Sequence, residues 1–140
     1  MIDELQVYKN NDHFFFTKEA DMKKVCNAPA KGMGVYVVYE LKNGRIRIVY
    51  IGAAGRLKNN GIKQTGNGFL NEFLDGIHFG GSREKTWKEK LASENIEALD
   101  IYWFETFNET VQDLPAMVQG QVLQEYYDLH GNLPEWNEIY

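Results

Sequence analysis

Cysteine is nearly absent from this sequence, and long apolar runs are absent altogether. The single cysteine, Cys26, excludes an internal disulfide and is typical of a protein kept in a reducing compartment. No apolar run approaches the roughly 20 residues that cross a bilayer, which excludes a transmembrane helix. The acidic first residues, Met1 to Leu5, do not form the apolar segment of a signal peptide. We therefore expect a cytoplasmic protein with no membrane partner.

Basic residues are missing from the last third of the chain. Residues 95–140 carry nine acids and no lysine or arginine, whereas residues 31–94 carry eleven bases and six acids. The formal net charge of −5 disfavours long duplex DNA as a partner, because neutralising phosphates supplies much of the affinity for DNA. The basic residues 31–94 are still compatible with an anionic partner that binds to a face formed by this segment.

The rest of the composition is that of a globular domain. Of the 140 residues, 44% are hydrophobic and 25% are charged, which excludes a disordered or collagen-like chain. We expect one domain over residues 1–140, with a helical lead segment at residues 1–31. In that segment, residues 14–16 predict a short buried strand or core anchor. Thr17 is expected to cap a helix that ends near Pro29.

The clearest local signal is an antiparallel hairpin. Residues 35–39 are β-branched or aromatic, and residues 45–51 alternate polar with apolar before becoming apolar throughout. Between them, Asn43 and Gly44 favour a tight turn because both tolerate positive φ. Residues 99–104 predict a third strand. The expected fold class is α/β, with a small three-stranded, mainly antiparallel sheet flanked by helices.

Three helices and one long loop are predicted around this sheet. The first helix covers residues 69–74 and ends at Gly76, the second covers residues 82–95, and the third begins after Pro115. The loop at residues 56–68 is polar and rich in glycine, and we interpret it as a functional loop.

Three short motifs lie on these elements. They are Gly34-Val35-Tyr36, Tyr50-Ile51-Gly52 and the closing Pro134-Glu135-Trp136-Asn137. Together with the order of the elements, these motifs resemble the GIY-YIG nuclease superfamily, and in particular its small bacterial members. The resemblance covers residues 32–138 and implies a GIY-YIG-like core after the lead segment.

The resemblance implies metal-assisted cleavage of phosphodiesters. In that family, two tyrosines lie beside a nucleophilic water and the phosphate. An arginine on the first helix after the hairpin stabilises the phosphate charge, and a glutamate on the last helix holds one divalent cation. Such a site needs cationic groups and an activated water, because a phosphodiester is anionic and a poor electrophile. Tyr36 and Tyr50 match the two tyrosine positions.

The charged family positions are replaced in this sequence. Glu72 is found where the arginine is expected, and residues 64–82 contain no lysine or arginine. A carboxylate about 5 Å from a phosphate repels it by roughly 3 kcal/mol at an effective dielectric of about 20. Alignment of the apolar stripe of the last helix places Gln119 at the metal position, where a neutral amide is a poor sole ligand for Mg²⁺. A count back from Pro134 reaches Glu125 instead.

Several further residues are candidates for holding a phosphate. Arg56 follows a glycine-rich turn whose N–H groups can face an anion, and His78 is expected beside the cleft. The predicted ligand-binding set is Gly34, Tyr36, Tyr50, Gly52, Arg56, Lys63, His78 and Arg83.

Three functions are compatible with these features. The first is a degenerate nuclease that binds a phosphodiester ligand, either nucleic acid or a small nucleotide signal that it sequesters, with no cofactor. The second is an active Mg²⁺-dependent DNA endonuclease that uses Glu125. The third is a protein-interaction module that uses the acidic residues 95–140. Because Glu72 and Gln119 occupy the charged catalytic positions, we favour the first function and lean towards a protein that is not an enzyme.

Overall fold

A computed structural model describes residues 2–64 and 66–140. In chain order its elements are the 3₁₀ helix η1 (Ile2–Val7), β1 (Asn11–Phe16), α1 (Met22–Val25), β2 (Met33–Lys42), β3 (Arg45–Ala54), α2 (Phe69–Asp75), β4 (Ile77–His78), β5 (Gly81–Ser82), α3 (Arg83–Ser93), β6 (Ala98–Phe107) and α4 (Pro115–His130). From β2 onward this is the predicted order of two strands, two helices, a strand and a helix, with the small hairpin β4–β5 added between α2 and α3.

The central sheet has four strands in the order β1-β6-β2-β3, and each neighbouring pair is antiparallel. The prediction of three strands was therefore wrong, because the lead segment supplies β1, which pairs with β6. Side chains alternate along β1, so Phe14 and Phe16 are buried while Phe15 is exposed. Three consecutive phenylalanines hide this alternation in the sequence, where strand signals depend on a period of two.

The hairpin of β2 and β3 forms as predicted. Asn43 and Gly44 adopt φ angles of 53° and 73°, the left-handed conformation that a two-residue hairpin turn requires. β2 lies between β6 and β3, and its first six residues are buried. This position explains why residues 35–39 form a continuous apolar run, which is typical of a strand covered on both faces.

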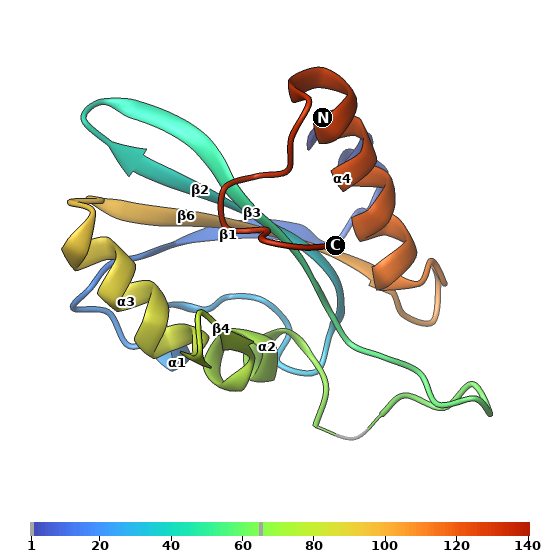
Figure 1. Ribbon diagram of the computed structural model, residues 1–140. Coiled ribbons are helices and arrows are strands. Elements are labelled where there is room, and N and C mark those ends of the chain that lie inside the picture. The colour runs from blue at the N-terminus through green and yellow to red at the C-terminus, as the bar shows by residue number, and fades with distance from the viewer. Residues whose placement is uncertain (1, 65) are drawn as a thin grey trace.

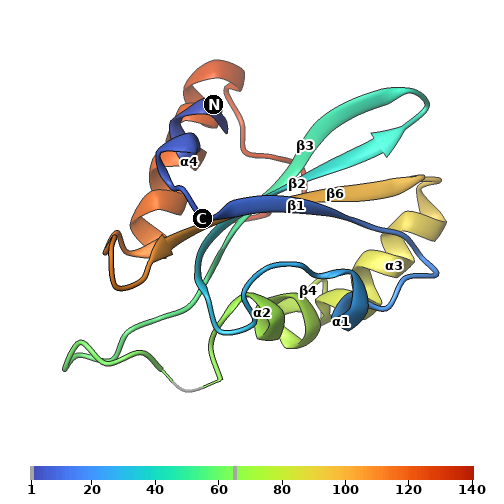
Figure 2. The same cartoon turned by 180° about the vertical axis from the view of Figure 1, so that it is seen from behind.

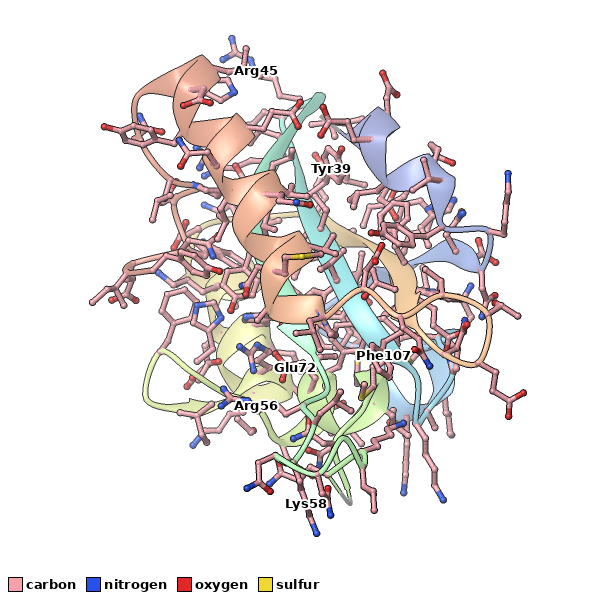
Figure 3. The ribbon with its side chains drawn as sticks, turned by 90° about the vertical axis from the view of Figure 1, so that its right-hand side faces the viewer. Tyr39, Arg45, Arg56, Lys58, Glu72 and Phe107 are labelled. Carbon is pink, nitrogen blue, oxygen red and sulfur yellow. The ribbon has the colours of Figure 1, made fainter. Side chains whose placement is uncertain are left out.

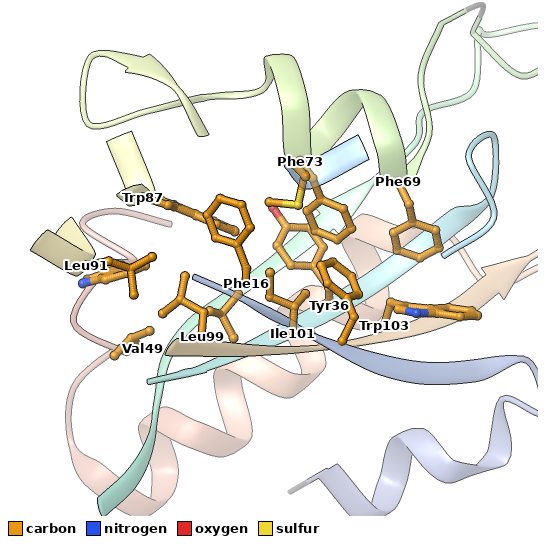
Figure 4. Packing of buried hydrophobic residues seen from close by; sticks show 14 of the residues in the cluster. Phe16, Tyr36, Val49, Phe69, Phe73, Trp87, Leu91, Leu99, Ile101 and Trp103 are labelled. Carbon is orange, nitrogen blue, oxygen red and sulfur yellow. The ribbon is translucent and has the colours of Figure 1, made fainter. Parts of the chain in front are cut away.

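Helices cover both faces of the sheet (Figures 1 and 2). α1, α2 and α3 lie against one face, and α4 with η1 lies against the other. The core under α2 and α3 is rich in aromatic side chains, and the rings of Tyr36 and Phe73 meet edge to face there with centroids 4.8 Å apart (Figure 4). Within the described residues, none of the helices has both the length and the apolar character to cross a membrane.

The first α-helix begins later than predicted. Thr17 only opens a turn, in which its carbonyl accepts from Ala20 N–H at 3.0 Å. Asp21 caps α1 by accepting from Lys23 N–H, and the Glu84 carboxylate of α3 accepts from Met22 N–H at 2.7 Å. The prediction for Thr17 was therefore wrong, because aspartate is the stronger N-cap and a distant carboxylate supports the later start.

A tight turn between β4 and β5 brings the start of α3 next to the end of α2. Phe79 and Gly80 have φ angles of 54° and 81° and join β4 to β5. Arg83 N–H then donates to the Gly76 carbonyl at 2.8 Å. The first residue of α3 is thereby held beside the residue that ends α2.

The closing segment lies along the free edge of β3. α4 ends at Gly131, which adopts φ of 73°. After it, Trp136 N–H donates to the Val49 carbonyl at 2.8 Å. The Asn137 side chain both donates to the Ile51 carbonyl and accepts from Ile51 N–H, each at 2.9 Å. The Asn137 amide therefore takes the place of the neighbouring strand that β3 lacks on this side.

We expect Asn137→Ala to lower the free energy of unfolding by about 2 kcal/mol. The change leaves the buried Ile51 N–H without a partner, while the Ile51 carbonyl keeps a 3.1 Å hydrogen bond from Gln119. Urea denaturation monitored by tryptophan fluorescence measures the loss. The matched control is Asn132→Ala, an exposed asparagine of the same segment, which should change stability by less than about 0.5 kcal/mol. Equal losses in the two variants would contradict the role given to Asn137.

Candidate functional site

Tyr36 and Tyr50 lie next to each other under the helices. They belong to the neighbouring strands β2 and β3, and their ring centroids are 5.9 Å apart. Gly52 makes room for both rings, since a Cβ at this position would overlap the Tyr36 ring and come within 2.7 Å of Tyr50. Tyr36 is fully buried, whereas Tyr50 is partly exposed and faces a cavity.

An ion pair joins the two tyrosines to the helices above them. Tyr36 OH donates to Glu72 Oε2 at 2.7 Å. The same oxygen lies 3.3 Å from Arg83 Nη1, and Arg83 Nη2 donates to Tyr50 OH at 3.1 Å. Tyr36, Glu72, Arg83 and Tyr50 thus form one polar network that connects β2, α2, α3 and β3.

Arg83 enters this network from α3, not from the helix that follows the hairpin directly. Its side chain is 8% exposed and lies against Gly76, where a Cβ would collide with Nη1. The missing side chain at Gly76 and the β4–β5 hairpin together let the guanidinium reach Glu72. The lack of a basic residue at positions 64–82 therefore does not leave the site without a guanidinium.

Burial and neighbouring charges set the protonation of two groups in the polar network. Burial raises the pKa of Tyr36 well above its usual range, and the Glu72 carboxylate adds to the rise while Arg83 opposes it. The Tyr36 phenol therefore keeps its proton near neutral pH and donates it to Glu72. Burial alone would lower the pKa of Arg83, but the oxygens of Tyr36, Glu72 and Tyr50 raise it overall. Arg83 consequently stays charged.

A cavity of about 930 Å³ opens beside the polar network. Tyr50, Glu72 and Arg83 form part of its wall, and the loop that follows β3 forms another part. That loop extends away from the sheet before it returns to α2 (Figure 1). In the view of Figure 3, Glu72, Arg56 and Lys58 follow one another on this side of the molecule, with Lys58 farthest out along the loop.

Positive groups outnumber negative groups around this cavity. Among the described residues that line it, Arg56, Lys58 and Arg83 are basic, and Glu72 is the one acid. The N-terminus of α4 also lines the cavity through residues 114–116, and no side chain caps it. Pro115 has no N–H, and the N–H groups of Met117 and Val118 donate to the Leu114 carbonyl, so it is the positive end of the helix dipole that attracts negative charge here. The cavity is therefore suited to an anion.

The two candidates for the family's metal position lie apart. Gln119 lines the cavity, and its Nε2 donates to the Ile51 carbonyl at 3.1 Å. Glu125 lies outside the cavity wall and interacts with Glu4 of η1. In the part of the chain that the structure describes, no three histidine, cysteine or acidic side chains gather into a set that could hold a metal ion.

His78 contacts the polar network, but both of its ring nitrogens are engaged. Trp87 Nε1 donates to Nδ1 at 2.9 Å, and this leaves the ring proton on Nε2, which donates to the Trp136 carbonyl at 2.9 Å. Burial lowers the pKa of His78, the Trp136 carbonyl opposes this, and Arg83 lowers it again. A neutral His78 therefore links β4, α3 and the closing segment.

The remaining predicted residues lie around the cavity rather than in its wall. Lys63 lines a neighbouring cavity of about 420 Å³ that shares Asn67 with the main one, and burial lowers the pKa of Lys63. Gly34 lies on β2, where a Cβ would collide with the Phe104 carbonyl, so its role is to let β2 and β6 approach. Of the predicted ligand-binding residues, the structure brings Tyr50, Arg56 and Arg83 together.

Two parts of the cavity wall are not in the predicted ligand-binding set. One is Lys58, which extends from the same loop as Arg56. The other is the N-terminus of α4 at residues 114–116. Pro115 indicates that a helix begins there, but the sequence contains no signal for which cavity that helix end faces.

Comparisons with protein-family models, with curated proteins and with solved structures each found no match to this chain. The resemblance to GIY-YIG nucleases therefore stays a prediction based on the motif residues. Function has to be inferred from the geometry and charge of the cavity.

We expect the folded protein to lose stability as the pH falls, in part through His78. Because the pKa of His78 is lowered in the folded state, the unfolded chain binds the proton first. Its contribution is therefore fully present above the unfolded pKa of about 6.5 and is lost as the pH falls from there through the folded pKa. His78→Gln keeps a donor and an acceptor but does not titrate, so its unfolding free energy should fall less between pH 7.5 and 5.

Urea denaturation at several pH values measures this difference. The control is Asn132→Ala, an exposed residue with no titratable group, which should follow the pH dependence of the wild type. A His78→Gln variant with the same pH dependence as the wild type would contradict the assigned role.

Proposed function

We propose that this protein is a GIY-YIG-like, catalytically degenerate protein that binds a small phosphorylated ligand, a nucleotide or a short phosphodiester, without cleaving it. The observation that carries the proposal is the cavity of about 930 Å³ with Arg56, Lys58 and Arg83 in its wall. Cavities that bind small molecules commonly measure about 300–1,000 Å³. Three cations beside an uncapped helix N-terminus favour a ligand with negative charge.

The distribution of charge supports a small ligand over a long duplex. Duplex DNA binds through many phosphates along an extended basic surface. This chain has a net charge of −5 and no base in residues 95–140, so it lacks the excess of basic residues that such an extended surface needs. A ligand that fits into the cavity avoids the acidic remainder of the surface.

The polar network supports binding without cleavage. Cleavage of a phosphodiester needs cationic groups at the developing charge and a group that activates water. Arg83 is already paired with Glu72, and the raised pKa of Tyr36 keeps its phenol protonated and unable to accept a proton from water. The carboxylate of Glu72 also lowers the positive potential where a phosphate would otherwise approach.

The arrangement of the motif residues supports the link to the GIY-YIG fold. The two motif tyrosines are neighbours on one hairpin, and Gly52 makes room for their rings. The asparagine of the closing motif, Asn137, is hydrogen-bonded to Ile51 of that hairpin. Motifs that are far apart in the chain thus meet on the β2–β3 hairpin.

We expect calorimetric titration to detect binding of ribonucleoside 5′-monophosphates or of a 5′-phosphorylated dinucleotide. The double variant Arg56→Gln/Lys58→Gln should weaken that binding about tenfold, because it removes two cations of the cavity wall.

The matched control is Lys18→Gln/Lys85→Gln. It removes the same charge from two exposed lysines outside the cavity and should leave the affinity within about twofold of the wild type. Failure of every nucleotide and dinucleotide to bind the wild type would refute the proposed function.

We expect supercoiled plasmid to stay intact when it is incubated with the wild type and Mg²⁺ or Mn²⁺. The physical reason is the engagement of Arg83 by Glu72 and of the Tyr36 proton by the same carboxylate. The readout is the conversion of supercoiled to nicked plasmid on an agarose gel. Nicking that is abolished by Tyr50→Phe would instead show an active nuclease.

A further inference from the structure

Glu72 is an unusual residue for the wall of an anion-binding cavity. It is the one acid among the described residues that line the cavity, and its side chain is 21% exposed. A carboxylate in this position repels a phosphate that approaches it. Its presence therefore needs an explanation in terms of what the bound molecule offers at this end of the cavity.

The hydrogen bonds of Glu72 fix its carboxylate in one orientation. Oε2 accepts from Tyr36 OH at 2.7 Å and lies 3.3 Å from Arg83 Nη1. For Oε1, no partner occurs among the residues that the structure describes. A carboxylate with one oxygen held by the protein and the other without a partner presents an acceptor of fixed position to the cavity.

Tyr50 adds a donor on the same wall. Its hydroxyl oxygen accepts from Arg83 Nη2 at 3.1 Å, so its own proton remains available to a bound molecule. Arg83 contacts both Glu72 and Tyr50, which keeps the acceptor and the donor close to each other. The inner wall thus offers an acceptor and a donor in place of a cluster of cations.

Resting on the proposed function, we infer that the cavity has two ends of different chemistry. Arg56 and Lys58 hold the phosphate at the loop, and Glu72 Oε1 accepts a hydrogen bond from an N–H or O–H group of the same ligand at the inner wall. The ligand class is therefore a nucleoside phosphate, whose base N–H groups and sugar hydroxyls both supply such donors. An inorganic phosphate or pyrophosphate satisfies only the loop end.

The variant Glu72→Gln tests the inner wall separately from the loop end, because it removes the charge of the carboxylate at nearly constant size. We expect it to weaken binding of the tightest of AMP, GMP, CMP and UMP about tenfold, since a charge-assisted hydrogen bond is replaced by a neutral one. The same variant should bind pyrophosphate more tightly than the wild type, because a repulsive charge is gone. The two changes have opposite signs.

The control is Asp75→Asn, which removes one negative charge from an exposed residue of the same helix outside the main cavity wall. It should leave both affinities within about twofold of the wild type. Calorimetric titration with ribose 5-phosphate identifies the donor. If Glu72→Gln also binds ribose 5-phosphate about tenfold more weakly than the wild type, the donor is a sugar hydroxyl. If the affinity falls only for the nucleotide, the donor is a base N–H.

The outcomes of these titrations are distinguishable. If Glu72→Gln binds nucleotide and pyrophosphate both more tightly, or matches Asp75→Asn for both, Glu72 accepts nothing from the ligand and the inference is overturned while the proposed function survives. If the wild type binds neither the nucleotides nor pyrophosphate, the proposed function itself fails. Circular dichroism of each variant confirms that the fold is retained.

Discussion

The ion pair between Glu72 and Arg83 is the interaction on which the rest of the site depends. It connects α2 to α3 and, through Tyr36 and Tyr50, connects both helices to the central sheet. A largely buried ion pair is stable only when hydrogen bonds replace the lost water, and the two phenols supply these bonds. The same contacts decide the chemistry of the cavity, because they use part of the charge of Arg83 internally and keep Glu72 in the wall.

The closing segment solves a different physical problem at the edge of the sheet. β3 has a neighbouring strand on one side only, and an unpaired strand edge invites association with other chains. Asn137 both donates to and accepts from Ile51, as a neighbouring strand would, and Trp136 N–H donates to the Val49 carbonyl. These contacts also bring the end of the chain next to His78, so the edge of the sheet and the surroundings of the cavity are stabilised together.

Much of the fold could be predicted because its signals are local. The turn at Asn43-Gly44, the apolar residues 35–39 and the helix start at Pro115 each depend on neighbouring residues only. Residues 14–16 were predicted as a short buried strand or core anchor but were not assigned to the sheet, because the pairing of β1 with β6 joins segments far apart in the chain. In the site, the tyrosines were found from their motif. The pairing of Arg83 with Glu72 depends on a turn with positive φ and on the absence of a side chain at Gly76. Neither requirement can be deduced from the spacing of residues in the sequence.

Gly76 has a consequence for how this sequence can change. Its lack of a Cβ admits the Arg83 guanidinium, and the guanidinium in turn neutralises Glu72. An arginine at position 72 would face the guanidinium of Arg83 across the same space, and any larger residue at position 76 would expel that guanidinium and isolate the carboxylate. Substitutions at the three positions are therefore epistatic. A chain with Glu72, Gly76 and Arg83 therefore reaches an arginine at position 72 only through less stable intermediates, which makes the three residues hard to replace one at a time.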